Sequence, residues 1–141
     1  MLRKISLVIV LFILVFHPQV IEAKEENNLE IFDPEQNKVL REIPMDEEIQ
    51  NMIVDWVNNI EDICLEMSPI TDDGYAVRFP CKSSIQVENK WLNASIKEVY
   101  LIIPESKSPS LIIFGDEGNP LCFSFTGDID KLSTILGFEL R

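Results

Sequence analysis

The residues of this chain best suited to chemistry are neighbouring carboxylates. They occur as Asp72-Asp73, as Asp116-Glu117, and as Asp128 with Asp130. Two carboxylates that flank a sugar bond can hydrolyse it, and oxygen-rich loops can bind Ca²⁺. However, Asp and Glu make up 24 of 141 residues, so such pairs arise by chance, and Asp128 suits a helix N-cap. We therefore predict no catalytic, cofactor-binding or metal-binding residue.

Histidine chemistry depends on one residue, because His17 is the only histidine in the chain. It lies in an N-terminal segment that we expect to be removed. The remaining chain would then lack Ser-His and Cys-His pairs, His-ligated zinc and a histidine general base. No glycine-rich phosphate loop occurs either. These features favour a non-enzymatic protein. The alternative is a carboxylate-based extracellular hydrolase that uses Asp72, Asp73, Asp116 and Glu117.

Three cysteines are present, Cys64, Cys81 and Cys122, with no C-x-x-C motif. An odd number leaves at least one thiol outside any disulfide in a monomer. A bridge between Cys64 and Cys81 is conceivable on the predicted elements. We favour three buried or partly buried thiols instead, since a domain of this size does not need disulfides for stability.

The N-terminus has the pattern of a secretory signal peptide. A basic start, Met1–Lys4, precedes a run from Ile5 to Phe16 that is apolar except for Ser6, and Ala23 offers a small residue for cleavage. We predict a signal peptide at residues 1–23, a secreted or extracytoplasmic protein, and no stable membrane anchor after cleavage. The alternative is a retained anchor, but the apolar run is shorter than the roughly 20 residues that span a bilayer.

The composition narrows the class of partner. With 12 basic and 24 acidic residues, the formal net charge is −12. Such a charge repels phosphate backbones and anionic membrane surfaces, so no nucleic-acid partner is expected. It suits a basic protein or cell-envelope partner, although a solvated acidic surface is the simpler interpretation. Alanine is rare and isoleucine common, which is typical of an AT-rich bacterial genome. The oligomeric state stays open.

The clearest predicted element is a long amphipathic helix over residues 46–67, with Asp46, Glu47 and Glu48 in its first turn. Its apolar side recurs every three or four residues: Ile49, Met52, Ile53, Trp56, Val57, Ile60, Ile63, Cys64 and Met67. Glu48, Asp55 and Asp62 would form an acidic ridge on the other side. This ridge is a candidate docking surface, and a solvated helix face is the simpler interpretation.

Strands are predicted around this helix. An opening hairpin pairs residues 29–32 with 38–43, and later strands cover 75–79, 84–87, 96–103, 111–114 and 121–125. A loop at Gly115–Pro120 joins the last two. A second helix follows Asp128 and ends at Gly137. We expect these aromatic residues in the core: Trp56, Phe79, Trp91, Tyr100, Phe114, Phe123 and Phe125.

Together these elements predict an α+β fold. It has a mainly antiparallel sheet with an opening β-hairpin, one long amphipathic helix packed on the sheet and a short C-terminal helix. A disordered charged tail at residues 24–28 would precede a single domain at 29–141. The predicted function is that of an exported small acidic bacterial protein with a binding or envelope-associated role. A structural, stress- or sporulation-associated envelope protein is a further alternative. For a binding role, the acidic ridge and the Gly115–Pro120 loop are the candidate surfaces.

Overall fold

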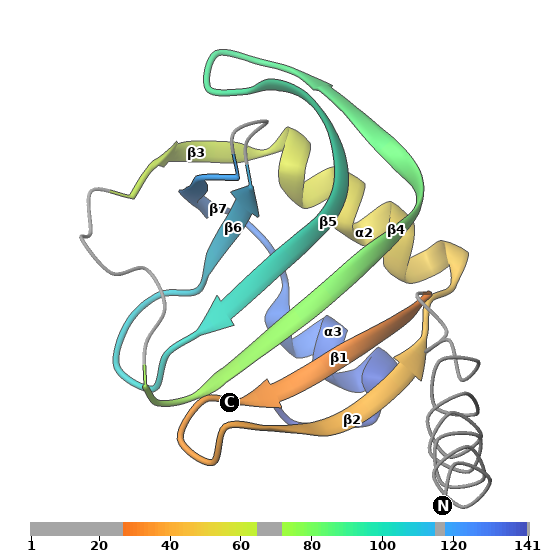
Figure 1. Ribbon diagram of the computed structural model, residues 1–141, viewed down its shortest axis with the longest axis vertical. Helices are drawn as coiled ribbons and strands as arrows, with labels where there is room; N and C mark the ends of the chain where they lie inside the picture. The colour runs from red at the N-terminus through yellow and green to blue at the C-terminus, as the bar shows by residue number, and fades with distance from the viewer. Residues whose placement is uncertain (1–26, 65–71, 115–117, 141) are drawn as a thin grey trace, which may run out of the picture.

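The computed structural model describes residues 27–64, 72–114 and 118–140. The predicted signal peptide, residues 24–26 of the predicted tail, and Asp116 and Glu117 lie outside these ranges. The described residues form an α+β fold with a seven-stranded antiparallel sheet and two helices. Figure 1 shows the sheet in front and both helices on its far face.

The sheet order is β2-β1-β4-β5-β6-β7-β3, so β2 and β3 are its edges. The strands are β1 (Asn28–Asp33), β2 (Lys38–Pro44), β3 (Ile60–Ile63), β4 (Tyr75–Glu88), β5 (Asn93–Ile103), β6 (Ser110–Phe114) and β7 (Pro120–Phe125). β4 and β5 form the long central pair. The edge strand β3 comes early in the chain but pairs with β7, which is more than 55 residues later in sequence.

β1 and β2 are antiparallel neighbours joined by a tight turn. Asp33 shapes this turn, because its Oδ1 accepts hydrogen bonds from the backbone N–H groups of Glu35 and Gln36 at 2.9 and 3.2 Å. Asn37 has a φ of 53°, a left-handed conformation that asparagine tolerates better than most residues. β1 already includes Asn28, which was predicted to belong to the disordered tail.

The prediction of one long helix over residues 46–67 is wrong at residues 60–63, which form a strand. Helix α2 (Glu47–Asn58) begins after Asp46, whose Oδ1 accepts a hydrogen bond from the N–H of Ile49 at 2.8 Å. It ends at Asn59, whose side-chain amide donates to the carbonyl oxygen of Asp55 at 2.7 Å. Asn58 and Asn59 are poor helix formers, and β-branched Ile60 suits the strand that follows. Residues 60–63 are therefore β3, while 65–67 lie outside the described ranges.

β4 is a single strand of 14 residues, where two strands divided at Pro80 were predicted. β1 pairs with β4 only at Ala76–Arg78, so beyond Phe79 the only neighbour of β4 within residues 27–64, 72–114 and 118–140 is β5. Proline is tolerated where one side of a strand is open, because its missing N–H costs no ladder hydrogen bond. The register shifts between Pro80 and Ile85. The side chain of Gln50 in α2 holds this irregular stretch. Its Nε2 donates a hydrogen bond to the carbonyl oxygen of Ser83, and its Oε1 accepts one from the N–H of Lys82.

The hydrophobic core lies between the helices and one face of the sheet. Trp56, Phe79 and Phe123 are at most 3% exposed there, as predicted. Trp91 and Phe125 are partly buried against the same cluster. The prediction fails for the other two aromatic residues, Tyr100 and Phe114, because both alternate onto the opposite face. Their rings meet edge to face with centroids 5.5 Å apart, and Phe114 is 44% exposed.

The second predicted helix is confirmed as α3 (Ile129–Leu136). Asp128 is its N-cap and accepts a hydrogen bond from the N–H of Lys131 at 2.9 Å. Gly137 ends the helix with a φ of 62°, a left-handed conformation in which glycine has no steric penalty. Ile129, Leu132 and Leu136 bury the helix against the sheet. Both helices are thus fixed on the same face by residues that the sequence marks clearly.

Candidate functional site

A groove of about 790 Å³ lies between α2 and the start of α3. One wall is a face of α2, with Glu48, Asn51, Met52 and Asp55. The other wall is the connection from β7 and the first residues of α3, from Thr126 to Lys131. We refer to it as the α2–α3 groove.

Trp56 forms the floor of this groove and is 3% exposed. Its ring packs against Phe125 with centroids 5.1 Å apart. Gly127 passes directly over it: a Cβ atom on Gly127 would lie 2.5 Å from Phe125 Cε2 and 2.7 Å from Trp56 Nε1. Only glycine fits this approach without movement of an aromatic ring, so Gly127 sets how closely the two walls stand.

Four exposed carboxylates surround the groove, those of Glu48, Asp55, Asp128 and Asp130. Glu48 and Asp55 are seven residues apart on α2 and therefore share one helix face. Within the described parts of the chain, no ion pair neutralises any of the four. Lys131 is the one basic residue among the lining residues. The groove thus carries an excess of negative charge and can attract a cationic group.

The carboxylates of the groove do not converge on a metal centre. Across residues 27–64, 72–114 and 118–140, no three His, Cys, Asp or Glu side chains are placed to share an ion. Asp128 is instead engaged as the N-cap of α3. Asp55 Oδ1 accepts a hydrogen bond from Asn59 Nδ2 at 3.2 Å. The arrangement suits recognition of a positively charged partner at an open surface.

The structure retains two of the three residues of the predicted acidic ridge. Glu48 and Asp55 line the groove as expected from their helical spacing. Asp62 does not join them, because it lies in β3, opposite Ser124 of β7. Two further carboxylates, those of Asp128 and Asp130, were not predicted on this surface, and they line the groove because the start of α3 lies beside α2.

Of the four carboxylates predicted for the hydrolase alternative, the two that the structure describes, Asp72 and Asp73, are not among the lining residues of the α2–α3 groove. Asp72 is exposed, and Asp73 Oδ1 accepts a hydrogen bond from the N–H of Glu105 at 3.3 Å. Asp116 and Glu117 fall outside the described residues. Of the predicted Gly115–Pro120 loop, Gly118 to Pro120 are described and exposed, and Pro120 is already the first residue of β7.

A second groove, of about 800 Å³, lies where the β1–β2 turn, the β5–β6 loop and Leu140 meet. Its carboxylates are Asp33, Glu35 and Glu105, and Lys107 also lines it. Asp33 is occupied in shaping its own turn. Most of the remaining lining comes from the loop at 104–109. Compared with the α2–α3 groove, this site offers fewer available carboxylates on regular elements.

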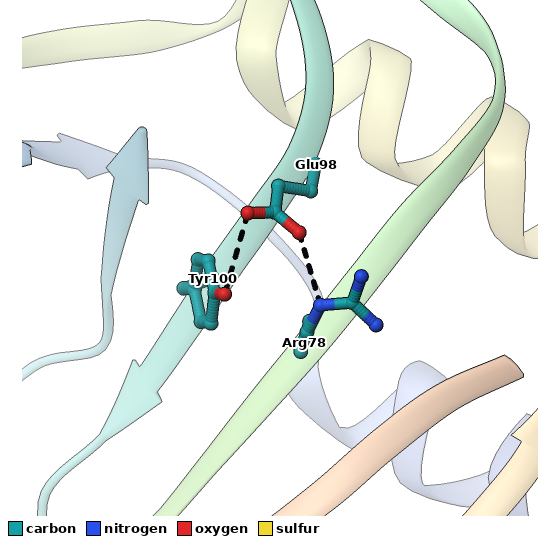
Figure 2. A network of polar contacts seen from close by, with 3 residues as sticks. All are labelled: Arg78, Glu98 and Tyr100. Carbon is teal, nitrogen blue, oxygen red and sulfur yellow. Dashed lines mark hydrogen bonds and ion pairs between the residues drawn. The ribbon is translucent and has the colours of Figure 1, made fainter. Parts of the chain in front are cut away.

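The face of the sheet opposite the two helices, which we call the open face, carries a polar network that was not predicted from sequence (Figure 2). Arg78 Nε donates to Glu98 Oε2 at 3.0 Å, and the Tyr100 hydroxyl donates to Glu98 Oε1 at 3.4 Å. Burial lowers the pKa of Arg78, but the hydrogen bond and charge of Glu98 outweigh it and raise the pKa overall. Burial and the charge of Glu98 also raise the pKa of Tyr100. Strand alternation in 75–79 and 96–103 was the available signal for this network.

The three cysteines have different surroundings. Cys122 is buried, while Cys64 and Cys81 are partly buried. Burial, followed by the charge of Glu98, raises the pKa of Cys81 to about 11. The bridge considered between Cys64 and Cys81 does not fit this sheet, because β3 and β4 are four strand positions apart. At about 4.8 Å per strand, that separation far exceeds the roughly 7 Å limit on Cα atoms in a disulfide.

Comparison with protein-family models, curated proteins and solved structures finds no match for this chain. Neither helix in the described ranges has the length and apolar character needed to cross a membrane.

Proposed function

We propose that this chain is an exported, non-enzymatic binding protein whose α2–α3 groove recognises a basic segment of a protein or cell-envelope partner. The observation that carries the proposal is the set of four exposed carboxylates around one groove, with Lys131 as the only basic residue among its described lining residues. The net charge of −12 acts in the same direction. A negative field attracts cationic partners and increases their association rate.

The lining of the groove indicates what such a partner should contain. Glu48 and Asp55 are about 10 Å apart along α2, since a helix rises 1.5 Å per residue. Two cationic side chains at a similar spacing could each face one carboxylate. Met52 lies between them on the same wall and offers an apolar contact. A peptide with two or more Lys or Arg residues around an apolar side chain is therefore the class of ligand we propose.

Binding of a defined basic peptide tests this function. We expect a ten-residue peptide with alternating Lys and Leu residues to bind the protein, measured by titration calorimetry at low ionic strength. The double variant Asp55→Asn with Asp130→Asn should weaken binding by at least tenfold, because it removes two of the groove's charges without adding bulk. The matched control is Asp62→Asn with Glu88→Gln, which removes two exposed charges away from the groove.

The control variant should bind within twofold of the unmodified protein. Equal losses in both double variants would mean that the peptide senses only the overall charge, and the groove would then have no specific role. Unchanged binding in the groove variant would contradict the proposal directly.

Export has its own test. The basic, apolar and small-residue order of residues 1–23 supports a cleaved signal peptide. We expect the intact mass of the native protein, recovered from the medium or the cell envelope, to correspond to a chain that begins at Lys24. A full-length mass confined to the membrane fraction would instead mean that the segment is kept as an anchor.

A further inference from the structure

Two cysteines that are far apart in sequence face each other across β3 and β7. Ile63 is paired with Phe123, and Asp62 with Ser124. One residue further along, the N–H of Cys64 donates to the carbonyl oxygen of Cys122 at 2.9 Å. The antiparallel register therefore continues beyond the end of β3 and places Cys64 directly opposite Cys122.

The two side chains must lie on the same face of the sheet. Residues directly opposite in an antiparallel pair point to the same side, and successive residues of a strand alternate. Phe123 points into the core and is 1% exposed, so Cys122 points to the open face. Its neighbour on the other side is Ile112 of β6. Cys64 fills the remaining position beside it.

The spacing of such a pair fits a disulfide. Opposite residues that share a hydrogen bond have Cα atoms about 5.5 Å apart, within the range of roughly 4.4–6.8 Å found in disulfides. Their Cβ atoms need to approach by about 1 Å from the usual cross-strand separation. β3 can make this adjustment because, among the strands that the structure describes, it lies at the edge of the sheet and pairs only with β7.

We propose that Cys64 and Cys122 form an intramolecular disulfide that fastens the edge strand β3 to β7 when the protein meets a disulfide oxidant. This modification is independent of the groove's role in binding. Export would deliver the chain to an oxidising compartment, where such bonds persist.

The reaction requires an oxidant of the disulfide class, for example oxidised glutathione or the disulfide of an oxidoreductase. Cys64 is the more accessible of the two thiols. Its thiolate attacks one sulfur of the oxidant, so that a mixed disulfide forms and one thiol of the oxidant leaves. The thiolate of Cys122 then attacks the sulfur of Cys64 and releases the second thiol. The protein thus loses two hydrogens, and the oxidant is reduced to two thiols.

Cys81 should stay outside this bond. β4 is separated from β7 by β5 and β6, which places Cys81 beyond disulfide reach of Cys122. Its raised pKa of about 11 also leaves little thiolate near pH 8. Cys81 is therefore the internal control for any reaction of the other two thiols.

The test is to oxidise the reduced protein with oxidised glutathione at pH 8, then unfold it and label the remaining thiols with a maleimide. We expect one label, on Cys81, and a proteolytic fragment in which Cys64 is joined to Cys122. The bond closes a loop of more than 55 residues, so we expect the midpoint of thermal unfolding to rise by about 10 °C.

Variants separate this result from general oxidation. Cys81→Ser should form the same bond and gain the same thermal shift, whereas Cys64→Ser should show neither. The mapping of the unmodified protein keeps the test decisive even if a variant folds poorly. Three labelled thiols, a bridge that includes Cys81, or a lasting glutathione adduct on Cys64 would each overturn the proposal.

Discussion

The thiol of Cys81 shows how the position of one residue in the fold changes its chemistry. It lies in the irregular part of β4, where it is partly buried and close enough to Glu98 to sense its charge. Both effects disfavour the thiolate, so the pKa rises to about 11. A cysteine with this pKa is a poor nucleophile at neutral pH. Although the predicted elements made a bridge between Cys64 and Cys81 conceivable, the structure separates Cys81 from the other two cysteines.

A raised pKa of a thiol has a definite consequence for stability. The unfolded chain releases the Cys81 proton near pH 9, while the folded protein holds it until about pH 11. The stabilisation is therefore complete below pH 9 and is lost as the pH rises from 9 to 11. Urea unfolding at pH 8 and pH 10.5 measures this effect. Between these pH values, we expect the free energy of unfolding to fall by about 1 kcal/mol more in the unmodified protein than in Cys81→Ser, a figure that is discounted for the partial exposure of the thiol.

The same variant controls for other groups that titrate in this range. Tyr100 also has a raised pKa and loses its stabilisation in the same direction, but it does so equally in both proteins. Site-specific alkylation gives a second readout, in which the rate at Cys81 should still be rising at pH 10.5. A rate that has levelled off by pH 9 would show that the thiol is not perturbed.

At the scale of the element, local signals predicted some boundaries well and others badly. The start of α2 and both ends of α3 are set by Asp46, Asp128 and Gly137, whose effects act within one turn. These signals can be read from sequence because they require no distant partner. The end of α2 is different, because the apolar spacing of Ile60 and Ile63 suits a helix as well. Pairing with β7 decides between the two, and the sequence does not display that pairing.

Strand faces were harder to predict than strand positions. Residues 111–114 are all apolar, so no alternation shows which side chains enter the core. The fold directs Leu111 and Ile113 inward and leaves Phe114 44% exposed. Pro80 was expected to end a strand, and it does not, because β1 leaves that part of β4 uncovered. In both cases, the missing information is which strand lies on each side.

The candidate site divides in the same way. Glu48 and Asp55 could be predicted together because seven residues along a helix return to the same face. Asp128 and Asp130 could not be assigned to that surface, since the approach of α3 to α2 depends on the sheet beneath both helices (Figure 1). The opposition of Cys64 and Cys122 likewise depends on the register of two strands from distant parts of the chain.

At the scale of the whole molecule, charge is the dominant property. The chain has twice as many acidic as basic residues, and both grooves carry more carboxylates than lysines. The Arg78–Glu98 pair lies on the open face of the sheet, away from the α2–α3 groove. Repulsion among the excess negative charges destabilises the compact folded state of such a molecule. A basic partner would relieve this repulsion, which links the stability of the protein to its proposed binding role.

Salt should therefore stabilise the free protein and weaken its complex. Raising NaCl from 20 mM to 500 mM shortens the screening length from roughly 20 Å to about 4 Å. We expect the midpoint of thermal unfolding to rise by about 3–5 °C, equivalent to about 1 kcal/mol, and peptide binding at the groove to weaken at least tenfold. The variant Glu48→Lys with Asp55→Lys changes the net charge by four units towards zero, so its midpoint should respond less to salt.

An unfolding midpoint that falls with salt, or an equal response in that variant, would show that attraction between specific pairs outweighs the repulsion. Binding that salt does not weaken would remove charge as the basis of recognition, because attraction between exposed charges is screened at this salt concentration.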